Sequence, residues 1–320
     1  MKIVVTGGAG FIGSHFIKHI INKYPSYDVI CVDKLTYAGR LENLSSVMEH
    51  PRFAFYKIDI CSRHDISSLF FALQPDVVVN FAAESHVDRA IAAPSTCIQT
   101  NYVGTQILLD ECVACGVRRF HQVSTDEVYG DLPLENDSEK FKEYSPLRPS
   151  SPYSASKAAA DLLAIAYART YGLTVTISRC SNNYGSFQHP EKFLPRMILN
   201  AHNNQPLPIY GSGLNIRDWI HVTDHCEAID LIIHNGKSSE VYNVGSCCEF
   251  SNIILAKLIC TELEKPYSLI KHVEDRKGHD LRYAINSQKL TKDLGWHPKI
   301  DFQTGLRQTI NWYIHQELSY

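Results

Sequence analysis

Short apolar segments rich in β-branched residues recur along the first half of the chain, and each has the length of a buried strand. They lie at residues 3–6, 29–32, 53–58, 77–81, 120–124 and 175–178. Segments with apolar residues three and four apart separate most of them and predict helices at residues 11–23, 64–73, 95–115 and 154–171. This alternation predicts an α/β fold, in which helices cover both faces of a doubly wound parallel sheet.

The pattern changes after about residue 183, where Gly, Pro, Asn and His become frequent and a strand at 207–210 is short and bracketed by turn residues. A smaller α+β C-terminal lobe is therefore expected. Residues 224–234 have the pattern of a helix and 241–244 that of a buried strand, so the chain is expected to return to the first sheet there. We predict a first domain of residues 1–185 rejoined by 224–245, and a second lobe of 186–223 and 246–320.

Composition and charge narrow the class of protein. The 320 residues are 44% hydrophobic and 20% charged, with a formal net charge of −3, which is ordinary for a globular enzyme and gives no reason to expect nucleic acid or membrane partners. The N-terminus lacks the features of a signal peptide. The ten cysteines show no paired spacing typical of zinc sites or disulfide frameworks, and Cys112 and Cys115 lie within a helical pattern. We expect a cytoplasmic protein with reduced cysteines and no metal.

Three glycines follow the first strand at the start of a helix. Gly7, Gly10 and Gly13 allow a tight turn, close approach of a pyrophosphate and close helix packing, although a purely structural turn could use the same residues. Asp33 closes the second strand twenty residues after Gly13, where a carboxylate accepts hydrogen bonds from ribose hydroxyls and repels a 2′-phosphate. The pattern therefore predicts a Rossmann domain that binds NAD in preference to NADP.

Other expected NAD contacts flank these glycines or follow the carboxyl ends of strands. Asp59 is placed near the adenine ring, with loop capping as the alternative role. The small residues after the fourth strand allow the backbone to pass close to the cofactor. The set is Phe11, Ile12, Lys34, Thr36, Asp59, Ile60, Phe81, Ala82 and Ala83.

Tyr153 and Lys157 are four residues apart and so lie on one face of a helix. The lysine, helped by the positive nicotinamide ring, is expected to lower the tyrosine pKa so that a phenolate accepts a hydroxyl proton while hydride leaves the carbon. Such pairs also occur by chance on helix surfaces. The glycine turn and Ser124-Thr125 at the end of the fifth strand favour the catalytic interpretation.

The motifs at residues 6–13 and 153–157 resemble the extended short-chain dehydrogenase family. Within it, the chain most resembles the dTDP-glucose 4,6-dehydratases, over almost its whole length. The residues that carry this resemblance lie at 80–89, 124–130, 179–185, 190–192, 217–219 and 278–280.

The resemblance implies a lyase reaction that uses Thr125, Asp126 and Glu127 together with Tyr153 and Lys157. After oxidation at C4 of the sugar, Glu127 removes the C5 proton and protonated Asp126 donates to the departing C6 hydroxyl. Hydride then returns to C6 and C5 is reprotonated, which gives a 4-keto-6-deoxy sugar nucleotide without net redox change. The alternative interpretation of the two carboxyl groups is a solvated loop pair.

The resemblance also implies binding residues. Ser85 and Thr100 would contact the cofactor or the substrate, with capping as the alternative role of each. Asn183 would contact the cofactor on its nicotinamide side, together with Tyr153 and Lys157. Lys192, Arg217 or Arg282 would neutralise the diphosphate of a nucleotide sugar, and Pro208 and Tyr210 would line the base pocket. The full substrate set is Ser85, His86, Thr125, Asn182, Glu191, Lys192, Pro208, Tyr210, Arg217, Asn252, His279 and Arg282. The long helices at 95–115 and 154–171 offer a face for a homodimer.

Two departures from the usual bacterial pattern lie in or near the expected substrate channel, at residues 186–189 and at Ala90. They leave thymine or uracil open as the base, because one methyl group in a pocket contributes only about 1 to 3 kcal/mol. UDP-glucose is therefore an alternative substrate. A 4-epimerase or a decarboxylase is a more distant alternative enzyme. A non-catalytic NAD-binding regulator would be expected to lack Tyr153, Lys157 or the acidic pair.

Overall fold

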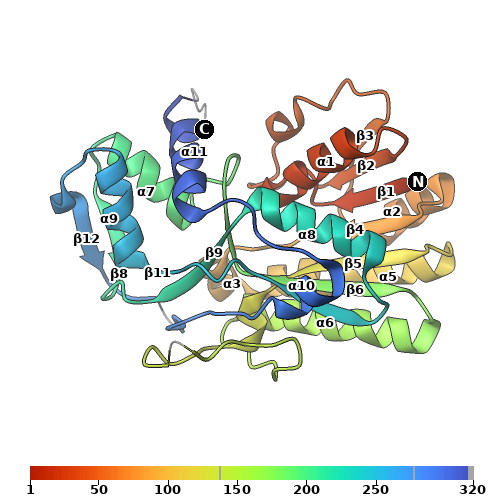
Figure 1. The fold of residues 1–320 in the computed structure, drawn as a ribbon. Coiled ribbons are helices and arrows are strands. Elements are labelled where there is room, and N and C mark those ends of the chain that lie inside the picture. The colour runs from red at the N-terminus through yellow and green to blue at the C-terminus, as the bar shows by residue number, and fades with distance from the viewer. Residues whose placement is uncertain (137, 277, 316–320) are drawn as a thin grey trace.

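The computed structural model describes residues 1–136, 138–276 and 278–315, and its centre is a seven-stranded parallel sheet (Figure 1). The strand order is β10-β6-β5-β4-β1-β2-β3, and all neighbours are parallel. The predicted doubly wound α/β fold is confirmed. The strands are β1 (Lys2–Thr6), β2 (Asp28–Asp33), β3 (Phe53–Lys57), β4 (Val77–Asn80), β5 (Arg119–Thr125), β6 (Val175–Cys180) and β10 (Glu240–Val244).

Helices cover both faces of this sheet, because every strand presents apolar side chains on each side. On one face pack α1 (Phe11–Lys23) and α8 (Val222–Asn235), and on the other α2 (Arg63–Leu73), α5 (Thr105–Ala114) and α6 (Pro152–Tyr171). Short elements complete this half of the molecule: α3 (Val87–Ala92), α4 (Pro94–Ile98), η1 (Leu41–Leu44), η2 (Gln99–Gly104) and η3 (Asp126–Tyr129). No helix in the described ranges is long and apolar enough to cross a membrane.

The helix predicted at 95–115 is divided into α4, the π-helical η2 and α5. Asn101 explains the interruption, because its side chain leaves the helix to bond the loop after β4. Its Oδ1 accepts from the Glu84 backbone N–H at 2.8 Å, and its Nδ2 donates to Ser156 Oγ at 2.9 Å. A π segment of this kind often marks a functional site, and here it contains Thr100, one of the predicted contact residues.

The second lobe has its own apolar core beside the carboxyl end of the sheet (Figure 1). One small sheet joins β11-β9-β7 and another joins β12-β8. The elements are β7 (Asn182–Tyr184), α7 (Phe193–His202), β8 (Leu207–Tyr210), β9 (Ile216–His221), β11 (Glu249–Ser251), α9 (Asn252–Glu262), η4 (Tyr267–Leu269), β12 (Ile270–Val273) and α11 (Phe302–His315).

The chain crosses between the two halves more than once. As expected, β10 returns to the main sheet and pairs with β6. The helix α10 (Gln288–Leu294) then packs there too, since Leu290 and Trp296 are buried with Ile232 and Tyr242. The predicted domain division remains a proposal, and this packing favours assigning residues 288–296 to the sheet domain. Residues 316–320 of the predicted second lobe lie outside the described part of the chain.

Candidate active site

A cavity of about 370 Å³ lies at the carboxyl end of the main sheet, between the two halves of the molecule. All eighteen residues predicted to contact the cofactor line it. So do the three further residues at the end of β5, and Asn182 and Lys192 from the second lobe. The cavity therefore unites the predicted cofactor and catalytic residues, which are Gly7, Gly10, Phe11, Ile12, Gly13, Asp33, Lys34, Thr36, Asp59, Ile60, Phe81, Ala82, Ala83, Ser85, Thr100, Thr125, Asp126, Glu127, Tyr153, Lys157 and Asn183.

The glycine turn after β1 leaves no room for side chains. Gly7 has φ +66°, and a Cβ there would lie 2.6 Å from the backbone nitrogen of Ala82. Gly10 caps α1 without any side-chain hydrogen bond, so the first backbone N–H groups of the helix face the cavity. Such a helix start attracts phosphate groups. The turn thus fits the pyrophosphate of NAD.

Asp33 ends β2 at the rim of this turn. Its carboxylate accepts from the backbone N–H of Ala9 at 3.0 Å and of Leu35 at 2.8 Å, and burial raises its pKa. A side chain fixed in this way fits two ribose hydroxyls. The neighbouring Asp59 pairs with Lys34 at 2.6 Å and accepts from the Cys61 N–H at 2.9 Å, which gives it a loop-capping role as well as a place in the cavity.

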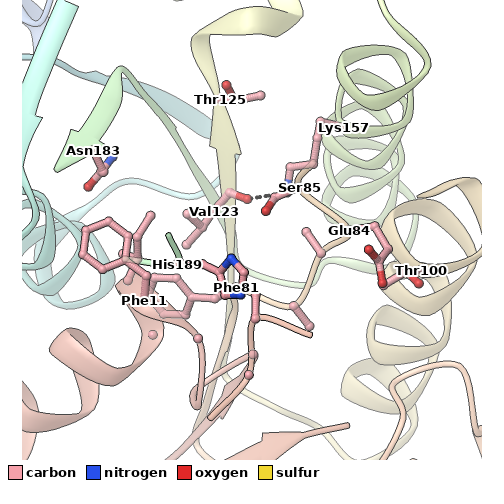
Figure 2. A pocket seen from close by; sticks show the side chains of 18 of the residues that line it. Phe11, Phe81, Glu84, Ser85, Thr100, Val123, Thr125, Lys157, Asn183 and His189 are labelled. Carbon is pink, nitrogen blue, oxygen red and sulfur yellow. Dashed lines mark hydrogen bonds between the residues drawn. The ribbon is translucent and has the colours of Figure 1, made fainter. Parts of the chain in front are cut away.

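Tyr153 and Lys157 lie in the first turns of α6, where Ser151 forms a capping box and Pro152 is the first helical residue. Both side chains are buried. The ammonium of Lys157 donates to the carbonyl oxygen of Val123 at 2.7 Å, so the lysine projects from α6 onto β5 (Figure 2). Burial lowers the pKa of Lys157, and the charge of Asp161 opposes this shift.

The expected lowering of the Tyr153 pKa is wrong for the protein without its cofactor. Burial raises the pKa of Tyr153 well above its usual value, and the nearby carboxyl groups of Glu127 and Asp126 raise it further. The sequence motif supplied the cation at position 157 but not the two acidic neighbours. A phenolate at Tyr153 therefore needs an additional positive charge nearby, which oxidised NAD carries on its nicotinamide ring.

The acidic pair lies directly after β5. Thr125 caps η3, accepting from the Glu127 N–H and donating to Asp126 Oδ1, both at 3.3 Å. Asp126 is 1% exposed. Its pKa is raised well above the usual value by burial, and also by the charges of Glu127 and Asp218. Burial also raises the pKa of Glu127, but Arg217 and Lys192 oppose that shift. Asp126 is thus the better acid and Glu127 the better base.

Two predicted residues from the second lobe are held by hydrogen bonds to protein groups. Lys192 donates to the carbonyl oxygen of Ser85 at 2.8 Å, which ties the start of α7 to the loop after β4. The amide of Asn183 bonds His225 Nδ1 at 2.9 Å and the Ser181 carbonyl at 3.0 Å. Figure 2 shows Asn183 across the cavity from Lys157. Asn183 thus anchors β7 to α8 beside the cavity.

The remaining predicted substrate residues do not line the cavity. They are His86, Glu191, Pro208, Tyr210, Arg217, Asn252, His279 and Arg282. Arg217 stacks on Tyr283 at 4.1 Å and donates to backbone carbonyls, while its charge still acts on Asp126 and Glu127. His86 lies 3.5 Å from Glu191, and the rings of Tyr210 and His279 lie 6.3 Å apart. Lys277, within the motif around His279, is outside the described residues.

The assignment of Arg282 to the diphosphate is not supported by its position. Its side chain is 0% exposed, pairs with Glu249 at 2.7 Å and donates to the carbonyl of Asn136 at 2.8 Å. A phosphate cannot reach it without breaking these bonds. Arg282 instead stabilises the contact between β11 and the loop after η3, and the sequence motif alone did not distinguish these two roles.

The cavity also contains residues for which the sequence predicted no binding or catalytic role of their own. Cys180 and Trp219 lie near the catalytic end, and Gln188 and His189 belong to the loop after β7. Arg89 stacks on Tyr37 at 3.7 Å, and the His189 ring meets Tyr37 edge-on at 5.6 Å. The departure at residues 186–189 was the available signal for this part of the wall. The others are Val32, Ala38, Gly39, Ile58, Glu84, Thr96, Val123, Ser124, Ser181, Phe193 and Leu194.

The chain is similar to known proteins over its whole length. The family profile described as GDP-mannose 4,6 dehydratase matches residues 4–309. A dTDP-glucose 4,6-dehydratase of Neisseria meningitidis serogroup B is 48% identical, covering 98% of this chain and 93% of that protein. The crystal structure of DesIV, a dTDP-glucose 4,6-dehydratase from Streptomyces venezuelae with NAD bound, has a TM-score of 0.95 at 46% identity, covering 98% and 97%. The NAD complex of the Bacillus anthracis dTDP-glucose 4,6-dehydratase has a TM-score of 0.92 at 45% identity, covering 99% and 97%.

Proposed function

The chain belongs to the GDP-mannose 4,6-dehydratase family, within the extended short-chain dehydrogenases, and from that premise we propose that it removes water from dTDP-glucose in an NAD-dependent reaction. The product is dTDP-4-keto-6-deoxyglucose, a precursor for deoxysugar biosynthesis. The enzyme is a hydro-lyase, because the hydride taken from C4 is returned to C6 and NAD is regenerated.

One observation carries this proposal: Asp126 and Glu127 share a buried cavity with Tyr153 and Lys157. A 4-epimerase needs only the hydride-transfer residues. Elimination of water needs an acid and a base as well, and the raised pKa of Asp126 favours a protonated carboxyl group beside a more readily ionised Glu127. The 1% exposure of Asp126 argues against a fully solvated loop pair.

Each residue then has a role that its position supports. Tyr153 accepts the proton of the C4 hydroxyl, Thr125 donates to the same oxygen, and Lys157 supplies positive charge from its place against β5. Glu127 removes the proton at C5. Asp126 protonates the departing C6 hydroxyl. Bound NAD would supply the hydride chemistry, taking hydride from C4 and giving it back at C6, and Glu127 would return a proton to C5. The glycine turn and Asp33 would hold the pyrophosphate and ribose of NAD.

We propose that residues of the second lobe bind the nucleotide part of the substrate. Lys192 lines the cavity, and the positive charge of Arg217 opposes the effect of burial on the pKa of Glu127. Both residues are therefore candidates for neutralising the diphosphate. The pair Tyr210 and His279, with Pro208 and Asn252 nearby in β8 and α9, is a candidate for the base pocket. Arg282 is left out of this set because it is fully buried.

Parallel assays with dTDP-glucose and UDP-glucose test the proposal. A product lighter by one water, with the alkaline absorbance of a 4-keto-6-deoxy sugar, is expected from dTDP-glucose, at a higher kcat/KM than from UDP-glucose. A higher kcat/KM with UDP-glucose would reassign the base. Substrate epimerised at C4 without loss of water would contradict the roles of Asp126 and Glu127.

We further propose that the chain is a cytoplasmic homodimer. All ten cysteines are free, which suits a reducing compartment. Among the described residues, α5 and α6 expose the large hydrophobic side chains of Val113, Leu162 and Tyr171. Leu162→Asp, at a side chain 58% exposed, is expected to produce monomers in light scattering, and an unchanged mass would place the interface elsewhere.

A further inference from the structure

A buried ion pair lies beneath the catalytic cavity, on the side of β5 and β6 that faces α6. The guanidinium of Arg179 donates to Asp161 Oδ2 at 2.9 Å, with side chains 3% and 0% exposed. The same oxygen accepts from Ser124 Oγ at 3.0 Å. Oδ1 of Asp161 is buried without a hydrogen-bond partner among the described residues. The mechanism proposed above uses neither member of the pair.

Asp161 stands one helical turn beyond Lys157, as Lys157 stands one turn beyond Tyr153. Residues four apart share a helix face, so this carboxylate lies on the catalytic side of α6. Its charge is the main influence that opposes the effect of burial on the pKa of Lys157. Ser124, which bonds Asp161, lies between Val123, the acceptor of the lysine, and Thr125.

Further hydrogen bonds hold Arg179 in place. It donates to the phenol oxygen of Tyr129 at 3.1 Å and lies over that ring, with its guanidinium carbon 4.9 Å from the centroid. The Tyr129 hydroxyl donates to Asn243 Oδ1 at 2.7 Å on β10. A buried ion pair is costly to desolvate and is often no more stabilising than an apolar replacement. The Arg179–Asp161 pair lies next to Lys157, which suggests that it has a role in the reaction.

We propose that Asp161 is a positioning residue of this active site, whose carboxylate, fixed by Arg179 and Ser124, keeps Lys157 charged in a buried environment and so sustains the phenolate of Tyr153. The proposal deepens the function proposed above and rests on it. Without the carboxylate, Lys157 and Arg179 would be two buried cations with no buried anion between them. Lys157 would then lose its proton more readily, and the pKa of Tyr153 would rise.

The Asp161→Asn variant of the full chain with NAD bound tests this, because asparagine keeps the shape and an acceptor but removes the charge. The acid limb of the kcat profile with dTDP-glucose is expected to move to higher pH by about one unit. The near-ultraviolet signal of the Tyr153 phenolate, obtained by subtracting a Tyr153→Phe background, is expected to shift in the same direction. An unshifted acid limb and phenolate titration would overturn the proposal, even if stability falls.

Three companion variants separate charge from architecture. Asp161→Glu restores the charge and is expected to return both titrations toward the unmodified protein. Ser124→Ala removes one hydrogen bond but no charge, so both titrations are expected to stay in place. If Asp161→Asn fails to fold, the double variant Asp161→Asn with Arg179→Gln leaves no unpaired cation at the pair, and its titrations are expected to shift as well. A double variant without any shift would overturn the proposal.

The phenolate titration does not need turnover. If the unmodified protein fails to dehydrate dTDP-glucose, the proposed function is contradicted. The link between Asp161 and Tyr153 is judged separately, by whether the phenolate signal moves.

Discussion

The ammonium of Lys157 donates to the carbonyl oxygen of Val123 at 2.7 Å, two residues before Thr125 begins the acidic turn. This bond fixes the catalytic helix α6 against β5, the strand that carries Thr125, Asp126 and Glu127. Hydride transfer and elimination therefore depend on one junction between a helix and a strand. A side chain misplaced there by about 1 Å can reduce the rate on the order of a hundredfold.

Replacing the base is expected to stop the reaction after the first step. Glu127→Gln cannot remove the C5 proton, so kcat should fall on the order of 10²- to 10⁴-fold. Oxidation at C4 still proceeds, and NADH absorbance should accumulate on mixing with dTDP-glucose. Glu135→Gln, at an exposed acidic residue, serves as the control with normal turnover. Normal turnover in Glu127→Gln would remove this residue from the mechanism.

The acid is expected to set the alkaline side of the pH profile. Burial and the charge of Glu127 raise the pKa of Asp126, so its carboxyl group stays protonated above the usual range and activity falls as pH rises through the raised value. Asp126→Asn has no proton to give, and its low residual rate should lack this limb. A full alkaline limb with the same midpoint in Asp126→Asn would assign the limb to another group.

Asp33 is expected to control the choice between NAD and NADP. Asp33→Asn removes the charge that repels a 2′-phosphate, and we expect roughly tenfold weaker NAD binding and a narrower preference over NADP. Titration calorimetry with both dinucleotides measures this. Asp28→Asn, at the opposite end of the same strand, is the matched control. If the Asp33 variant and the control prefer NAD over NADP to the same extent, another residue recognises the ribose.

Replacing Arg282 is expected to affect the stability of the fold, and replacing Arg217 is expected to affect substrate binding. Arg282→Met removes one partner of Glu249, which keeps its ion pair with Lys140 at 3.2 Å, and leaves the Asn136 carbonyl without its donor. The free energy of unfolding should fall by about 1 to 3 kcal/mol, with a nearly unchanged KM. Arg217→Met should instead raise KM. Urea denaturation and steady-state kinetics of both variants provide the comparison. A stable Arg282→Met with a raised KM would return this residue to the substrate site.

Local patterns were enough to predict the sheet, the glycine turn and the shared helix face of Tyr153 and Lys157. The turn requires Gly7 at positive φ next to Ala82, and the helix period alone places Tyr153 and Lys157 on one face. The return of β10 to the main sheet also followed from a short buried apolar strand. In each case the residues that define the feature lie close together in the sequence.

Features that depend on distant partners could not be predicted. Arg282 meets Glu249 thirty-three positions away, and only the folded chain shows that this pairing buries it. The pKa of Tyr153 is raised first by burial and then by carboxyl groups on a different element, and neither follows from the helix pattern. The π segment arises because Asn101 bonds Glu84 and Ser156 across three elements. Helical periodicity carries no information about such bonds.

Isotope tracing with dTDP-glucose deuterated at C4 follows hydride transfer and loss of water in one molecule. We expect a product that is lighter by one water and has its deuterium at C6, as mass spectrometry and NMR would detect. A product that keeps all its oxygen atoms and is inverted at C4, or a dehydrated product with deuterium lost to solvent, would contradict the proposed reaction.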